Sequence, residues 1–339
     1  QKDYAYALKE DSDTDVIWID RPTRHPLIWF KKRKRKIDGI TVLRPWGLVN
    51  EYESFRTIDR RIFDLQTSKY IGQSACLWSI CCTHPWLSKN NTFSQTIYWP
   101  GDYFEPKEEF HEYKDYDLVM PWVGLEDIPS NFGGRKFLSS TCAGNEFMNF
   151  HDNRLLNKRF DTLTKYKHKV SYIGGLSWKR IDFELLNKMA STLENTVFLL
   201  GVKSDGLHET EEAKLKLLQS YSNVRIWEDL NYNELAELVF KCDVGIIPYR
   251  VSGQNLRICP NKFFEYSALG KNTVTTSIPS MSRYSPPALV AKSHQEFIDL
   301  LSVSLRKPKN QELNDKLSEI AQHASSRETL KRIGSLISE

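Results

Sequence analysis

Residues 259–270 read Cys259-Pro260-Asn261-Lys262-Phe263-Phe264-Glu265-Tyr266-Ser267-Ala268-Leu269-Gly270. The Pro-Asn-Lys opening predicts the start of a helix, and Gly270 marks its end. The first N–H groups of a helix have no partner inside it, and the helix dipole is positive there, so this start suits an anion. Lys262 adds a cation, and Glu265 offers a carboxylate to the hydroxyls of a ribose. The segment therefore favours a seat for a nucleotide diphosphate, with an ordinary capped helix as the alternative.

A second anion site is predicted upstream. Residues 170–173 have the pattern of a short buried strand, and Gly174 and Gly175 follow it directly. A helix is expected over residues 181–193, because its apolar residues recur at spacings of four. Glycine lets the backbone approach a phosphate closely, so the strand, glycine pair and helix start together suit an anion. A tight turn is the alternative.

Strands and helices alternate from about residue 170 to 276. Further strands are expected at 196–201, 223–227 and 243–248, with one helix over 209–220 and another after Asn231. This alternation predicts a parallel sheet covered on both faces, with ligands beyond the carboxyl ends of the strands. The candidate binding residues expected at those ends are Gly174, Gly175, Trp227, Tyr249, Arg250, Asn261 and Lys262.

Residues 172–281 resemble the nucleotide-binding half of group-1 GT-B glycosyltransferases. The motifs that carry the resemblance are Tyr-Ile-Gly-Gly-Leu at 172–176, Cys-Asp-Val-Gly-Ile-Ile-Pro-Tyr at 242–249 and Pro-Asn-Lys-Phe-Phe-Glu-Tyr-Ser-Ala-Leu-Gly-Lys at 260–271. They are most similar to teichuronic-acid glycosyltransferases of the TuaH kind and to the xanthan glucuronosyltransferase GumK. The resemblance implies an α/β GT-B fold of two Rossmann-like domains facing a cleft. It also implies that Gly174, Gly175 and Lys262 hold the diphosphate of a nucleotide sugar and that Glu265 holds the ribose.

Arg257 departs from the pattern of that family. Many retaining members have a second glutamate eight positions before the ribose-binding one, and Arg257 stands at that place here. An arginine cannot act as a carboxylate, but it can pair with a diphosphate or with an acidic sugar such as a uronic acid. This departure favours the branch that inverts the anomeric centre.

The first half of the chain is compatible with the second Rossmann-like domain. Short apolar runs at 15–20, 75–80, 96–99 and 117–120 are expected to be buried strands. Asp102 follows the third run, and in the resembling family this position faces the cleft, so Asp102 is the candidate general base for the acceptor hydroxyl. The alternative is that Asp102 only closes a Pro-Gly-Asp turn. Since such domains normally begin with a strand and a glycine-bearing loop, we expect that residues preceding Gln1 are missing.

A basic run follows an apolar segment near the start. The candidate membrane-docking residues are Trp29, Phe30, Lys31, Lys32, Arg33, Lys34, Arg35 and Lys36. An aromatic tip can enter lipid headgroups while the cations meet anionic lipids, each worth about 1 kcal/mol. A solvated loop and a nucleic-acid patch are the alternatives, but no nucleic-acid-binding motif accompanies the run.

Composition sets the remaining limits. The chain has 339 residues, of which 40% are hydrophobic and 27% charged, and this is enough for two domains with cores. Three regions are predicted. Residues 1–160 form the domain that binds acceptor and membrane, and residues 161–308 form the domain that binds the donor. Residues 309–339 are terminal helices that we expect to cross back to the first domain. The six cysteines show no metal-binding spacing, so we expect reduced thiols, no metal and no cofactor besides the nucleotide-sugar co-substrate.

The sequence therefore predicts a metal-independent glycosyltransferase. We expect it to transfer sugar to a glycan or lipid-linked acceptor of a bacterial surface polysaccharide, at the cytoplasmic face of an anionic membrane, without a nucleic-acid partner. Two other classes stay open: a sugar-nucleotide epimerase of GT-B-like fold, and a noncatalytic polybasic adaptor for membrane or nucleic acid. The nucleobase, the sugar, the acceptor and the oligomeric state are not encoded legibly in the sequence.

Overall fold

The computed structural model of the protein divides the chain into two compact units. The first contains Gln1–Pro121, Asp127–Ser140 and Ser326–Glu339, and the second contains Trp122–Glu126 and Thr141–Ser325. The structure describes residues 2–11, 15–19, 34–37, 39–43, 61–62, 64–71, 75–80, 93–99, 116–120, 136–137, 142–150, 160, 166–177, 179–203, 209–228, 230–306 and 310–338.

The second unit is built on one parallel sheet of six strands. Its strands are β8 (His168–Gly175), β9 (Thr196–Lys203), β10 (Val224–Trp227), β11 (Val244–Ile247), β12 (Asn272–Thr276) and β13 (Leu289–Ala291). They lie in the order β10-β9-β8-β11-β12-β13, and every pairing between neighbours is parallel. The predicted parallel sheet is confirmed, and β13 is a further strand that the sequence analysis did not identify.

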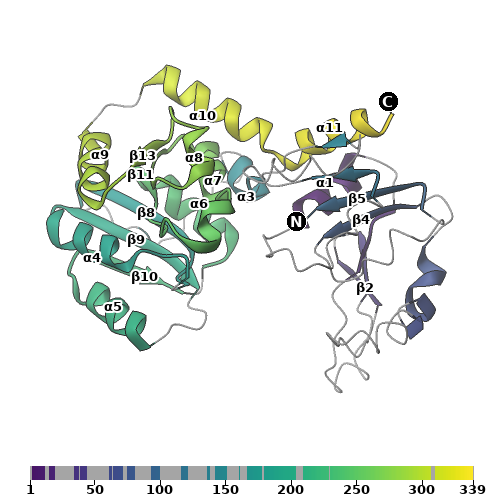
Figure 1. Cartoon of the computed structure of the whole chain (residues 1–339), viewed down its shortest axis with the longest axis horizontal. Coiled ribbons are helices and arrows are strands. Elements are labelled where there is room, and N and C mark those ends of the chain that lie inside the picture. The colour runs from purple at the N-terminus through teal and green to yellow at the C-terminus, as the bar shows by residue number, and fades with distance from the viewer. Residues whose placement is uncertain are drawn as a thin grey trace. The chain divides into compact units, whose positions relative to one another are not determined.

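Helices alternate with these strands, as the apolar periodicity predicts (Figure 1). They are α3 (Asn145–Met148), α4 (Phe183–Thr192), α5 (Glu209–Ser220), α6 (Tyr232–Phe240), the 3-10 helix η7 (Gly253–Arg257), α7 (Asn261–Ala268), α8 (Pro279–Ser282), α9 (His294–Arg306) and α10 (Gln311–His323). The capping box that starts α6 is confirmed: Glu234 N donates to Asn231 Oδ1 at 3.0 Å, and Asn231 N donates to Glu234 Oε2 at 2.9 Å.

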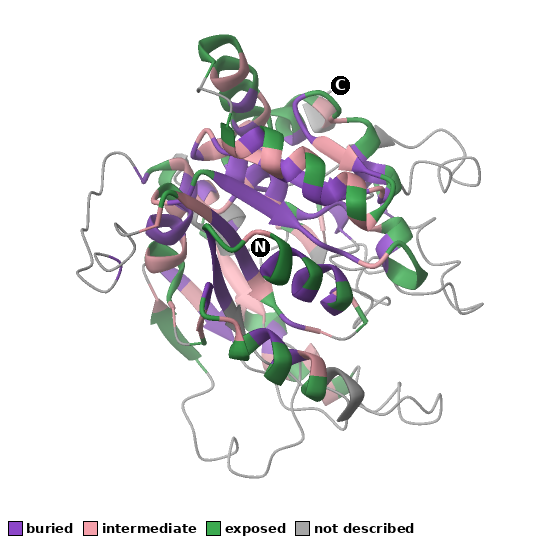
Figure 2. Ribbon diagram, turned by 90° about the vertical axis from the view of Figure 1, so that its left-hand side faces the viewer, coloured by how far each residue is buried: buried purple, intermediate pink, exposed green. Residues whose placement is uncertain are grey.

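One continuous hydrophobic core fills this unit. The central strands are buried on both faces, because helices cover both sides of the sheet. Figure 2 shows buried residues along the strands and on inward helix faces, with exposed residues on the outward faces. Two glycines allow close packing of helix on sheet, since a Cβ on Gly245 would lie 2.5 Å from the Tyr266 ring and one on Gly201 would lie 2.5 Å from Leu235.

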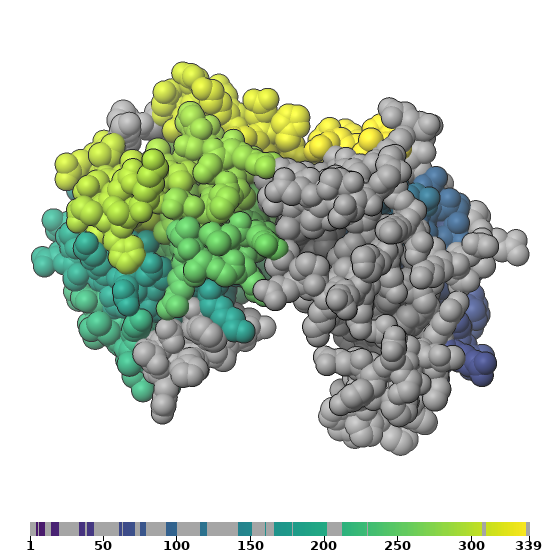
Figure 3. Space-filling model, in the orientation of Figure 1, coloured from purple at the N-terminus to yellow at the C-terminus, as the bar shows by residue number. Residues whose placement is uncertain are grey.

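The carboxyl-terminal part of the second unit is held by helix packing and one buried lysine. Helix α10 packs against α7, and both contribute to the surface in Figure 3. Lys271 is 3% exposed and donates from Nζ to the carbonyl oxygens of Phe240 and Cys242, each at 2.6 Å. These carbonyls belong to the end of α6, where the helix dipole favours a cation. Lys271 therefore ties the end of α6 to the start of β12.

The first unit contains two small sheets. One has the order β4-β5-β6-β7 and is parallel: β4 (Cys76–Ile80), β5 (Gln95–Trp99), β6 (Leu118–Val119) and β7 (Lys136–Phe137). The other has the order β1-β3-β2: β1 (Ile17–Ile19), β3 (Ile40–Leu43) and β2 (Lys34–Ile37). The unit also holds α1 (Lys2–Asp11), the 3-10 helix η2 (Ser68–Tyr70) and α11 (Ser326–Ser338), which contacts α1. All four strands expected in this half are present, and β5 and β6 are buried as expected. The burial predicted for the other two is wrong, because β1 is half-buried and Cys76 on β4 is exposed.

The division between the units differs from the predicted one. Residues 142–150, which the sequence analysis assigned to the first domain, belong to the second unit, where α3 packs against α6 and α7. The two terminal helices separate: α10 stays with the second unit and α11 joins the first. The described residues contain no helix long and apolar enough to cross a membrane.

Substitution of Gly245 tests the close contact between β11 and α7. We expect Gly245→Ala to lower the stability by about 1–3 kcal/mol, because the added methyl overlaps the buried Tyr266 ring. Thermal unfolding would show a lower Tm. Gly334→Ala in α11 is the matched control, since an added Cβ there meets no described atom within 4 Å. An unchanged Tm for Gly245→Ala would contradict this packing.

Candidate functional site

The candidate site lies where the sheet changes winding direction. Strand β8 comes first in the chain, β9 and β10 follow on one side of it, and β11 to β13 follow on the other. In such sheets the crevice beyond the carboxyl ends of the two strands at the switch point is the usual place for a ligand. Here those two strands are β8 and β11, so the crevice lies between the residues that follow Ile173 and those that follow Ile247.

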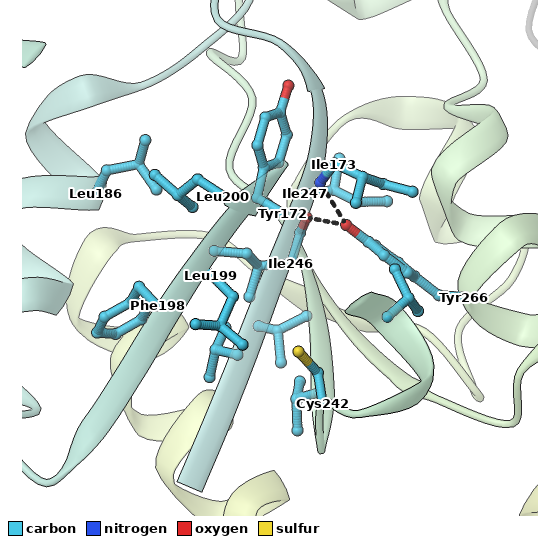
Figure 4. Close-up of a cluster of buried hydrophobic side chains, with 14 of the residues drawn as sticks. Tyr172, Ile173, Leu186, Phe198, Leu199, Leu200, Cys242, Ile246, Ile247 and Tyr266 are labelled. Carbon is cyan, nitrogen blue, oxygen red and sulfur yellow. Dashed lines mark hydrogen bonds between the residues drawn. The ribbon is translucent and has the colours of Figure 1, made fainter. Parts of the chain in front are cut away.

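Strands β8 and β11 separate before their ends. Their ladder pairs only Val170 with Val244 and Ser171 with Gly245. Beyond it the Tyr266 hydroxyl lies between the strands, where it accepts from Ile173 N and contacts the carbonyl oxygens of Ser171 and Ile246, all at 3.3 Å (Figure 4). A side chain from α7 thus replaces backbone pairing at this point.

The glycine pair at the end of β8 faces Lys262. Gly174 has φ +115°, a backbone conformation that residues other than glycine rarely adopt. A Cβ there would lie 2.7 Å from both Cε and Nζ of Lys262, so the lysine end rests against the Gly174 backbone. Gly175 is exposed, and its carbonyl accepts a hydrogen bond from Tyr172 Oη at 2.8 Å. The structure therefore brings together the two anion sites predicted separately from the sequence.

Lys262 is fixed by two tyrosines. Its Nζ donates to Tyr249 Oη at 2.9 Å and lies 5.5 Å from the ring centroids of both Tyr172 and Tyr249. Both rings are fully or almost fully buried, so the ammonium lies against a buried aromatic surface, here called the aromatic floor. Tyr249 itself is 1% exposed, and it contributes to the site by holding Lys262.

Two residues of this site were missed by sequence reasoning. Arg180 places its guanidinium 5.9 Å from the Tyr249 ring centroid, and Lys262 Nζ lies 5.5 Å from the same centroid, so two cations lie near this ring. Asn255 is only 2% exposed, and its Nδ2 lies 3.3, 3.1 and 2.9 Å from the carbonyl oxygens of Lys179, Arg180 and Arg250. This amide joins the turn after β8 to the segment after β11. The Lys-Arg pair shortly after Gly-Gly was a usable signal for Arg180, whereas nothing in the sequence marks Asn255.

The other predicted residues take different places. Arg250 is tied to the same turn, with Nε donating to Ile181 O at 3.1 Å. Asn261 is exposed at the first position of α7, and Glu265 is half-buried one turn after Lys262. Arg257 is exposed at the end of η7.

Trp227 lies apart from this cluster. It ends the edge strand β10, two strands away from β8, and its ring packs edge-on against Phe160 with centroids 5.6 Å apart. This packing connects Trp227 to the core of the unit and not to Lys262.

Several candidates fall outside the part of the chain that the structure describes. Asp102, the predicted base, is one of them, and the others are Trp29, Phe30, Lys31, Lys32 and Arg33. Of the basic run, the structure describes Lys34, Arg35 and Lys36, which are exposed on β2. Within the described ranges, no group of three or more His, Cys, Asp or Glu side chains is arranged to hold a metal ion.

The chemistry of the cluster is that of an anion site. Lys262 stands in the first turn of α7, where the helix dipole adds to its charge, and Arg180 supplies a second positive charge near the Tyr249 ring. Burial raises the pKa of Tyr172 and that of Tyr266 well above their ordinary value, so both hydroxyls stay protonated and neutral. The floor of the site carries no negative charge from these tyrosines.

Comparison with curated proteins finds a relative of this chain. The chain is 28% identical over 238 residues to the putative teichuronic acid biosynthesis glycosyltransferase TuaH of Bacillus subtilis. The match covers 64% of this chain and 59% of that protein, so the chain spans less than two thirds of the relative's length. No protein-family model matches the chain.

Comparison with solved structures shows the fold. An α,α-trehalose-phosphate synthase (UDP-forming) from Burkholderia xenovorans, in complex with glucose-6-phosphate, superposes with a TM-score of 0.72 at 11% identity, covering 100% of this chain and 96% of that one. An E. coli structure described as trehalose-6-phosphate bound with UDP-2-fluoro glucose superposes with a TM-score of 0.70 at 10% identity, covering 99% and 95%. The predicted GT-B fold of two Rossmann-like domains is confirmed.

Alkaline pH tests the burial of the tyrosines. Tyrosines of the unfolded chain ionise near pH 10, and Tyr172 and Tyr266 ionise at higher pH when folded. Their contribution to stability is therefore complete below about pH 10 and is lost as the pH rises further. Denaturant unfolding between pH 8 and 11 would show this decline, and Tyr266→Phe would make it shallower. Equal slopes for the variant and the unchanged protein would contradict this assignment.

Proposed function

We propose that this chain, which has the GT-B fold, is a glycosyltransferase that moves a sugar from a nucleotide-diphosphate sugar to an acceptor hydroxyl. The observation that carries the proposal is the contact between the left-handed Gly174 and Lys262 at the switch point of the sheet. The fold and the similarity to a putative glycosyltransferase support the same class of enzyme. A sugar-nucleotide epimerase would use the same site, and the similarity to a putative glycosyltransferase favours transfer over epimerisation. The adaptor alternative has no comparable observation in its favour.

The donor diphosphate lies over the aromatic floor in this proposal. A nucleotide-sugar diphosphate carries two negative charges, and Lys262 and Arg180 together neutralise them. The N–H groups at the start of α7 and the Gly174–Gly175 backbone complete the seat. Glu265, one turn along α7, accepts the ribose hydroxyls. Because the two cations supply the charge, the proposed reaction needs no metal and no further cofactor.

The proposed acceptor is a glycan or lipid-linked glycan of a bacterial surface polysaccharide. The name of the relative, a putative teichuronic acid biosynthesis enzyme, supports this class of product. The basic strand β2 supports a place at the cytoplasmic face of an anionic membrane. Its Lys34, Arg35 and Lys36 are exposed, and Lys34 and Lys69 both lie near the Tyr70 ring, at 4.8 and 5.1 Å from its centroid.

We further propose that the transfer inverts the anomeric centre. Arg257 stands where many retaining relatives have a glutamate, and it is exposed on η7, the segment that leads from Arg250 into α7. An inverting displacement needs one general base for the acceptor hydroxyl, and Asp102 is the residue we propose for it. Arg257 then serves the diphosphate or an acidic donor sugar.

Replacement of Lys262 tests the donor seat. We expect Lys262→Ala to weaken binding of a UDP-, GDP- or dTDP-sugar by about 10- to 100-fold, because a charge-assisted hydrogen bond is worth about 1.5–3 kcal/mol. Calorimetric titration of a panel of these nucleotide sugars measures the loss. Lys188→Ala, on the exposed side of α4, is the control and should bind the donor normally. Unchanged affinity in Lys262→Ala would remove this lysine from the donor site.

Neutralisation of the basic strand tests the membrane proposal. Replacing Lys34, Arg35 and Lys36 with glutamine should reduce binding to phosphatidylserine-containing vesicles by roughly 10- to 100-fold, since each cation near the surface contributes about 1 kcal/mol. Vesicle sedimentation measures the bound fraction. The control carries glutamine at Lys188, Lys216 and Lys316, which are exposed helix positions of the second unit. Equal vesicle binding by both triple variants would reject a role for β2.

A further inference from the structure

The proposed donor site contains two buried tyrosines whose hydroxyls bond Lys262 and the Gly175 carbonyl. Tyr172 is on β8 and Tyr249 follows β11, so they come from opposite sides of the crevice. Tyr172 is fully buried and Tyr249 is 1% exposed. Buried hydroxyls are costly unless they are hydrogen-bonded, so their partners indicate why they are present.

The two hydroxyls bond to different parts of the site. Tyr172 Oη donates its single proton to Gly175 O at 2.8 Å. Tyr249 Oη accepts from Lys262 Nζ at 2.9 Å. One tyrosine therefore holds the glycine loop, and the other holds the lysine.

These contacts restrain the Lys262 side chain, which is otherwise flexible. Lysine carries its charge on a four-carbon stem and loses much rotamer freedom when it is held in one place. Lys262 Nζ lies 5.5 Å from each of the two ring centroids, and its end rests against Gly174. An ammonium that is already in place avoids the ordering cost when the anion arrives. The hydrogen bond from Tyr172 Oη fixes the Gly175 carbonyl, and with it the glycine loop.

We propose that Tyr249 and Tyr172 are positioning residues, which hold Lys262 and the Gly174–Gly175 loop in the geometry that receives a diphosphate before any ligand binds. This inference rests on the proposed donor site for its purpose, although the positioning itself is a property of the ligand-free protein. Tyr249 and Tyr172 act through Lys262 and Gly175, and neither side chain needs to touch the donor.

The first experiment needs no nucleotide. An amine-reactive reagent labels the lysines of the folded protein, and peptide mass spectrometry gives the rate for Lys262. Tyr249→Phe keeps the ring but removes the acceptor, so we expect the Lys262 labelling rate to rise about fivefold, the factor that corresponds to one hydrogen bond of about 1 kcal/mol. Tyr172→Phe, which removes a hydroxyl that bonds Gly175 and not Lys262, should give a smaller rise. Lys188 in the same sample is the internal reference.

Tyr266→Phe is the matched control. It also removes one buried tyrosine hydroxyl, but that hydroxyl bonds to the backbone of β8 and β11. It should lower the Tm without changing the ratio of Lys262 to Lys188 labelling. If Tyr249→Phe leaves this ratio unchanged, or if Tyr266→Phe raises it equally, the positioning role is wrong.

The second experiment is a double-mutant cycle on diphosphate affinity. UDP and UMP are titrated into the unchanged protein, Tyr249→Phe, Lys262→Met and the double variant. We expect Tyr249→Phe to weaken UDP binding about fivefold and UMP binding much less, and to have no further effect when Lys262 is already replaced. An equal loss in both backgrounds would overturn the coupling. If neither nucleotide binds the unchanged protein while the labelling result holds, the donor proposal fails and the positioning inference survives.

Discussion

The site depends on the hydroxyl of Tyr266, which separates two strands that would otherwise pair along their length. The β8–β11 ladder ends after two residue pairs, and the phenol then serves the backbone groups of both strands. Buried backbone groups need partners, so the strands can separate only where a side chain supplies them. Gly245 permits this arrangement, because a larger residue there would overlap the Tyr266 ring.

Separation of the strands gives the crevice two independent walls. One wall is the glycine loop and the turn at Lys179 and Arg180, and the other is the segment that begins at Tyr249. Asn255 joins them through three carbonyl oxygens, and Lys262 joins them a second time, because it donates to Tyr249 and rests against Gly174. Backbone position and cation position are thus set by different contacts, which explains how a long lysine side chain and an exposed loop come together at the candidate site.

The sequence predicted the second unit well because its signals are local. Apolar periodicity located α4, a polar stretch rich in Lys and Glu located α5, the Asn231–Glu234 pair located the start of α6, and Pro-Asn-Lys located α7. The sequence did not show that Asn255 would be buried inside an exposed segment, because its three partners are 5 to 76 positions away along the chain. It also placed Trp227 with the binding residues, since a strand end is visible in a sequence but the order of strands in the sheet is not.

The segment over residues 251–257 combines a fixed backbone with a variable surface. Val251, Gln254 and Leu256 are exposed, while Asn255 is buried and bonds the Arg250 carbonyl from within. Mutations at these three exposed positions can therefore accumulate without disturbing the turn that carries Arg180. Such a division lets the surface of the segment diverge among relatives while its backbone stays in place, and it gives a protein engineer three positions to vary.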